Sequence, residues 1–164
     1  MKFVADGMLG SLARWLRMMG HDVVYLHGLD DDKLMTLAKE GRMLLTRDLE
    51  LYRRSAARGI NAFYVEGKTE AERLAALAQR FGIALEIDLK TSRCPRCNTP
   101  VQSVSKAQIA DKVEQNTFAH YQEFWECPNC KKVYWQGAHW PKIRDTLEDA
   151  KSLVKTGPGV PAIS

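Results

Sequence analysis

The chain has 164 residues, of which 45% are hydrophobic and 27% are charged, and its formal net charge is +4. This is the composition of an ordinary folded protein, so it excludes a disordered, collagen-like or coiled-coil chain. The length suits one domain, or one small domain with a mini-domain attached.

The apolar runs are far shorter than the roughly 20 residues that a membrane-spanning helix needs. Asp6 also interrupts the N-terminus before any signal-peptide core could form. We therefore expect a cytoplasmic protein without a membrane partner. The basic excess is mild, so it permits a polyanionic partner without requiring one.

The first half of the chain alternates short apolar stretches with amphipathic ones. The apolar stretches, which read as strands, are residues 2–5, 23–26, 43–46 and 62–65. Helical spacing of apolar residues follows each of them, over residues 8–19, 30–41, 48–58 and 69–80. Thr69 with Glu72 forms a capping-box sequence at the start of the last helix. The order predicts an α/β, three-layer arrangement, with a mainly parallel sheet between helices.

Every predicted strand is followed by at least one carboxylate. These acids are Asp6, then Asp30, Asp31 and Asp32, then Asp48 and Glu50, and finally Glu66. Ligands of open parallel sheets bind beyond the carboxyl ends of the strands. Carboxylates gathered there stay ionised only with a cation among them, and oxygen ligands suit Mg²⁺ or Mn²⁺. Such ions activate water for phosphodiester hydrolysis.

Helix capping is the alternative interpretation of these acids, because aspartate is a common N-cap. Asp31, Asp32 and Asp48 could each be caps alone, whereas Asp6 directly follows a strand and precedes Gly7. Arginine suits bidentate contact with phosphate. The expected substrate-binding residues are accordingly those nearest the acids, namely Arg14 and Arg17 on the polar face of the first helix and Thr46 and Arg47 beside Asp48.

The four cysteines form two Cys-x-x-Cys pairs, which are Cys94 with Cys97 and Cys127 with Cys130. In a reducing compartment such a set indicates a metal site, and four thiolates with no open position suit structural zinc. A redox motif is the alternative, although it would not need duplication.

The sequence therefore divides into three parts. These are an α/β domain at residues 1–90, which carries the acids, a zinc ribbon at 91–147, and a helix end with a flexible tail at 148–164. We expect ribbon strands at residues 101–104, 124–126 and 133–135, and a loop or partner-facing insertion at 106–118. Near the second pair, tryptophans fit stacking on unpaired bases and lysines fit attraction of phosphates. Alternatively, the tryptophans pack the ribbon or dock it on the first domain.

Several segments together resemble the Mut-seven C-terminal RNase domain family. They are Phe3–Gly10 with Leu12–Arg17 and Gly20, then Gly41-Arg42 with Leu45–Asp48, Ser92–Asn98, and Phe124 with the second cysteine pair, Tyr134–Gly137 and His139. The resemblance covers residues 2–147. It implies a PIN-like nuclease fold with a zinc ribbon and a metal-dependent ribonuclease activity.

The resemblance matches Asp6, Asp31 and Asp48 to the acids that hold a catalytic Mg²⁺ or Mn²⁺, with Glu50 in support and Asp30 or Asp32 as alternatives to Asp31. The leading hypothesis is thus a ribonuclease with structural zinc and RNA as its partner. The alternative is a non-catalytic RNA- or ribosome-binding adaptor, and a phosphatase ranks last because no phosphate-cradling glycine loop is present. A homodimer or a protein partner is left open.

Overall fold

The first half of the chain folds around a parallel sheet in the computed structural model, which describes residues 1–156. The strands are β1 (Lys2–Ala5), β2 (Asp22–Val24), β3 (Met43–Thr46) and β4 (Ala62–Tyr64), in the order β2-β1-β3-β4. All three pairings are parallel. The predicted α/β fold with a parallel sheet is confirmed.

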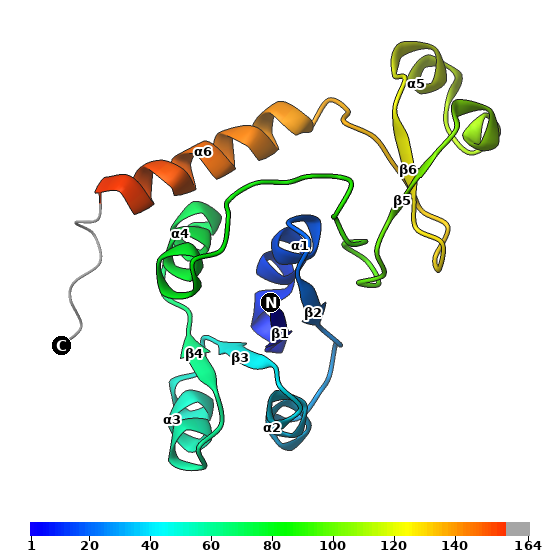
Figure 1. Ribbon diagram of the computed structural model, residues 1–164. Coiled ribbons are helices and arrows are strands. Elements are labelled where there is room, and N and C mark those ends of the chain that lie inside the picture. Colours follow the sequence, from blue (N-terminus) through cyan, green and yellow to red (C-terminus); the bar gives the residue numbers. More distant parts are fainter. Residues whose placement is uncertain (157–164) are drawn as a thin grey trace.

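Helices cover both faces of this sheet (Figure 1). A 3₁₀ turn η1 (Gly7–Leu9) leads into α1 (Gly10–Met18), and the other helices are α2 (Asp31–Lys39), α3 (Leu49–Ala57) and α4 (Glu70–Phe81). Side chains alternate between the two faces of β1, because successive residues of a strand point in opposite directions. Phe3 and Ala5 pack in one core with α1 and α4, whereas Val4 packs with α2 and α3. The predicted capping box of Thr69 and Glu72 is present.

The second half carries a three-stranded antiparallel sheet. Its strands are β5 (Gln102–Val104), β6 (Phe124–Glu126) and β7 (Val133–Tyr134). Between β5 and β6 the chain forms a 3₁₀ helix η2 (Lys106–Ile109) and a short helix α5 (Gln115–His120). The prediction of a loop over residues 106–118 is therefore wrong. Ile109 and Phe118 fold this segment back onto Phe124, which gives it a small apolar core of its own.

The last described helix, α6 (Trp140–Thr156), returns to the first half of the chain and packs on α4 (Figure 1). Leu147 and Ala150 are buried in the same core as α1 and α4. The domain limits at residues 90 and 147 stay predictions. The tail expected beyond residue 156 lies outside the described residues.

Within residues 1–156, no helix combines the length and the apolar character that crossing a bilayer requires.

Candidate active site and metal centre

The strand order reverses its direction between β1 and β3, and this switch point marks one place at the carboxyl end of the parallel sheet. From β1 the chain goes to β2 on one side, and then to β3 on the other side of β1. Ligands of open α/β sheets bind at such a switch point, beyond the carboxyl ends of the strands. Asp6 directly follows β1, while Thr46 ends β3 and Asp48 follows it. These three residues, which we call the acidic site, therefore flank the switch point.

Thr46 joins the two acids of the acidic site. Its Oγ1 donates a hydrogen bond to Asp6 Oδ2 (2.8 Å) and accepts one from the backbone N–H of Asp48 (2.9 Å). The Thr46 side chain is 0% exposed. The Thr46 hydroxyl, which was expected to contact substrate, is buried and already bonded within the protein. Thr46 instead fixes the carboxylate of Asp6 and the backbone of Asp48.

Asp48 also caps helix α3. Its Oδ1 accepts hydrogen bonds from the backbone N–H groups of Glu50 (2.9 Å) and Leu51 (3.2 Å). The capping interpretation therefore holds for one oxygen of this carboxylate. Within residues 1–156, Asp6 Oδ1 and Asp48 Oδ2 have no hydrogen-bond partner, and both side chains are partly exposed. Each acid keeps one oxygen available to a ligand.

The other acids occupy separate positions. Asp30 is the N-cap of α2, since its carboxylate accepts from the N–H of Lys33 (2.8 Å). Asp31 forms an ion pair with Arg54 of α3. Glu50 is exposed in the first turn of α3. Over the part of the chain that the structure describes, Asp6, Asp31 and Asp48 do not form a group that could share one ion.

Arg17, predicted on the polar face of α1, is buried within the protein. It is 5% exposed, and its Nε and Nη2 donate to the carbonyl of Val23 (3.0 and 2.8 Å). Its Nη1 donates to the carbonyl of Pro95 (2.9 Å). The segment around the first cysteine pair covers this side of α1, which the helical pattern alone could not reveal. Burial lowers the pKa of the Arg17 guanidinium, opposed by the nearby cysteines.

The two remaining predicted arginines differ from each other. Arg47 is half-buried, and its Nη1 donates to the carbonyls of Val65 and Gly67 (both 2.9 Å), so it ties the end of β3 to the loop after β4. Arg14 is exposed on α1 and makes no ion pair within residues 1–156. Arg14 is thus the one of the three whose guanidinium is available to a phosphate.

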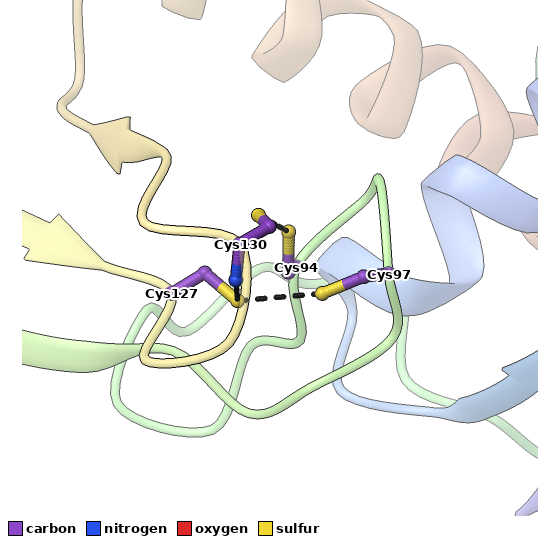
Figure 2. Close-up of side chains that lie close together, drawn as sticks. All are labelled: Cys94, Cys97, Cys127 and Cys130. Atoms are coloured by element: carbon purple, nitrogen blue, oxygen red, sulfur yellow. Dashed lines mark hydrogen bonds between the residues drawn. The ribbon is translucent and has the colours of Figure 1, made fainter.

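The sulfur atoms of Cys94, Cys97, Cys127 and Cys130, which we call the cysteine cluster, all lie within 4.8 Å of one another (Figure 2). The distance is 3.6 Å between the Sγ atoms of Cys94 and Cys130, and 3.3 Å between those of Cys97 and Cys127. Tetrahedral zinc with Zn–S bonds of about 2.3 Å separates its sulfurs by about 3.8 Å. The four thiols are free, so the cluster could hold zinc.

Hydroxyl groups lie beside two sulfurs of the cysteine cluster. The Tyr134 hydroxyl lies 3.0 Å from Cys94 Sγ, and the Thr99 hydroxyl lies 3.4 Å from Cys97 Sγ. Against the effect of burial, hydrogen bonds with the side chain and backbone of Thr99 lower the pKa of the Cys97 thiol to about 5, whereas burial raises the pKa of the Cys127 thiol to about 12. Metal binding at such a site releases protons, because each ligand must be a thiolate.

Sequence reasoning missed Tyr134 and Thr99 as neighbours of the cluster. Thr99 comes two residues after Cys97, close enough for a turn to bring them together, and Tyr134 lies on β7 just after the second pair. This proximity in sequence was the available signal. Hydroxyl groups near ligating sulfurs orient them and adjust their basicity.

A sequence model of the Mut7-C RNAse domain family matches residues 1–147. The match spans the whole parallel sheet, the acidic site and the cysteine cluster. No curated protein and no solved structure matches the chain.

Proposed function

Because the chain belongs to the Mut7-C RNAse domain family, we propose that it is a ribonuclease that hydrolyses RNA phosphodiester bonds at the acidic site. One observation carries this proposal. Two carboxylates, Asp6 and Asp48, are joined through the buried Thr46 at the switch point of the sheet, and each keeps one oxygen without a partner in the described chain.

The donor set of the acidic site fits a hard divalent cation. Mg²⁺ in enzymes is commonly bound by only one or two carboxylates, together with water and substrate phosphate oxygens. We propose that Asp6 and Asp48 hold Mg²⁺ or Mn²⁺, with Asp31 and Glu50 as outer acids of the same end of the sheet. When bound, such an ion supplies an activated water and stabilises charge on the phosphate.

The chain's own residues divide the remaining tasks. Thr46 holds Asp6 in a fixed orientation by donating to Oδ2, which leaves Oδ1 without a hydrogen bond in the described chain. Arg47 braces the end of the sheet through the Val65 and Gly67 carbonyls. Arg14 is the proposed phosphate contact, because its guanidinium is exposed and charged. Arg17 is left out of substrate binding, since its donors are used within the protein.

The cysteine cluster is proposed to hold one structural zinc ion. The observed sulfur separations of 3.3 and 3.6 Å approach those of a tetrahedral Cys₄ site. Four protein ligands leave no open position for a reactant, so the proposed role of this ion is structural. Exposed Lys131 and Lys132 next to this cluster give the second half a basic surface that suits contact with RNA.

Cleavage of labelled single-stranded and structured RNAs in Mn²⁺ tests the ribonuclease. We expect the wild type to cleave, and Asp6→Asn and Asp48→Asn to lower the rate roughly 10²-fold or more, as loss of one stabilising group in an active site commonly does. Asp149→Asn makes the same chemical change on an exposed residue of α6 and should leave the rate unchanged. Equal cleavage by wild type and both site variants would sink the proposal.

A second candidate is the RNA- or ribosome-binding adaptor, which the pairing of Asp31 with Arg54 favours because it removes one acid from the metal site. RNA binding by an adaptor would survive Asp6→Asn and fall steeply with salt. Tight, salt-dependent binding without any cleavage by the wild type would favour the adaptor over the ribonuclease.

A further inference from the structure

The turn around the first cysteine pair, which we call the first knuckle (residues 94–98), lies against the edge strand β2. Within residues 1–156, β2 has a partner strand, β1, on one side only. On its other side the Val23 N–H donates to Asn98 Oδ1 (3.0 Å), while the Val23 carbonyl accepts from Arg17 (2.8 and 3.0 Å). Unpaired backbone groups of an edge strand attract other chains and weaken the sheet. Here the groups of Val23 are satisfied without another strand.

Further hydrogen bonds join the first knuckle to the same region. Asn98 Nδ2 donates to Asp22 Oδ1 (2.7 Å), and Asp22 in turn pairs with Arg42 (2.9 Å). Arg17 Nη1 reaches the Pro95 carbonyl (2.9 Å), so one guanidinium bonds to both the strand and the knuckle. The first knuckle is thus bonded to β2 through both backbone and side-chain groups, rather than packed beside it by apolar contact alone.

The backbone of the first knuckle explains how Asn98 is held there. Asn98 has φ +71°, a left-handed conformation that few residues other than glycine and asparagine adopt readily. Its N–H donates to the Cys94 carbonyl (2.8 Å), and the Asn98 carbonyl accepts from Arg93 Nη1 (2.9 Å). The turn that places Asn98 on Val23 is therefore the same turn that brings Cys94 and Cys97 together.

The second knuckle (residues 127–131) repeats this backbone without the sheet contact. Lys131 directly follows Cys130, has φ +66°, and donates its N–H to the Cys127 carbonyl (2.9 Å). Its side chain is exposed and makes no hydrogen bond within residues 1–156. Both cysteine pairs therefore adopt the same turn, whereas only the first has a side chain, that of Asn98, which bonds to β2.

We propose that the first knuckle caps the β2 edge of the parallel sheet. An ion held by the cysteine cluster then stabilises the α/β half, because it maintains the hydrogen bond between the Val23 N–H and Asn98 Oδ1. The inference rests on the proposed zinc ion and not on the ribonuclease activity. Without the ion the four sulfurs lose their common partner and the knuckle loosens, since metal ligation and folding of such turns are linked. Val23 then loses its acceptor.

Hydrogen exchange at the Val23 amide, in the full chain, tests this inference. We expect removal of zinc with a chelator to speed exchange of this amide by about 10-fold or more, the factor that corresponds to loss of one hydrogen bond. Amides of β3, at the centre of the sheet, should change less. Equal protection of Val23 with and without zinc would overturn the proposal.

A matched pair of variants separates the side chain from the turn. Asn98→Gly and Lys131→Gly both retain the four cysteines and a residue suited to positive φ, so both should bind zinc. Only Asn98→Gly should speed Val23 exchange in the zinc-loaded protein, and chelation should add little to it. Equal effects of the two variants would overturn the inference. Should Asn98→Gly fail to fold, exchange of the Val23 amide in the wild type with and without chelator tests the inference alone.

Discussion

Charged groups at the acidic site are bonded to the protein around them, whereas the sulfurs of the cysteine cluster chiefly face one another. Asp6 is bonded to Thr46, and Asp48 caps α3. The four sulfurs instead lie within 4.8 Å of one another. Ligands on tight turns are grouped by local chain geometry, while ligands on separate strands and helices depend on how those elements pack. A metal should therefore matter more for folding in the cysteine cluster than at the acidic site.

The largest expected effect comes from breaking the cysteine cluster. Cys127 is buried among the ligands, and a structural zinc site in peptides is worth roughly 10–16 kcal/mol of binding free energy. We expect Cys127→Ser to lose its zinc and to unfold β5–β7, as measured by metal content and by the thermal unfolding midpoint. Lys132→Ala, an exposed neighbour, should keep one zinc ion per chain. Full zinc in Cys127→Ser would contradict the assignment.

Thr46 tests the acidic site through a group that a substrate cannot reach. Thr46→Val preserves the shape of the side chain but removes the hydroxyl that bonds to Asp6 and Asp48. We expect RNA cleavage to fall about 10–100-fold, the usual loss when a group that orients a metal ligand is removed. Thr46→Ser keeps the hydroxyl and should recover most of the rate. Equal rates for Thr46→Val and wild type would show that this orientation is unimportant for cleavage.

Asp22 connects the parallel sheet to the first knuckle, because it bonds to both Arg42 and Asn98. The hydrogen bond from Arg42 lowers the pKa of Asp22 from 3.8 to about 2, although burial opposes this. The folded value lies below the unfolded one, so this stabilisation is present above about pH 4 and is lost as the pH falls towards about 2.

We therefore expect Asp22→Asn to lower the free energy of unfolding at pH 7 by about 2 kcal/mol. Urea unfolding at pH 7 and at pH 3 measures the effect, and the variant should lose less stability than the wild type on acidification. Asp32→Asn, an exposed acid on α2, is the control. The same pH dependence in Asp22→Asn and the wild type would show that another group is responsible.

The smallest stability effect is expected at Asp31. The side chains of Asp31 and Arg54 are 43% and 39% exposed, and such surface pairs contribute under about 1 kcal/mol. Asp31→Asn should therefore change stability little, and should reduce cleavage much less than Asp6→Asn does. A loss of cleavage as large as that of Asp6→Asn would mean that Asp31 leaves Arg54 and joins the acidic site. The ligands of the acidic site would then converge as those of the cysteine cluster do.

Most helices and strands could be predicted from the sequence, because each depends on spacing within a short segment. The 3₁₀ and α-helical segment after β5 was the exception, since its few apolar residues find their partners only on β6. The cysteine cluster was predictable for the same local reason, as two residues separate the cysteines of each pair.

The sequence by itself determined which acids follow the strands and which cysteines form pairs, because both are matters of order along the chain. Only the tertiary structure decided that Arg17 is buried, that Thr46 joins Asp6 to Asp48, and that Asp31 faces Arg54. Each of these contacts joins residues from different elements, and a side chain's partners there depend on sheet order and helix packing. For that reason the residues at one end of the sheet could be named in advance, while their individual roles could not.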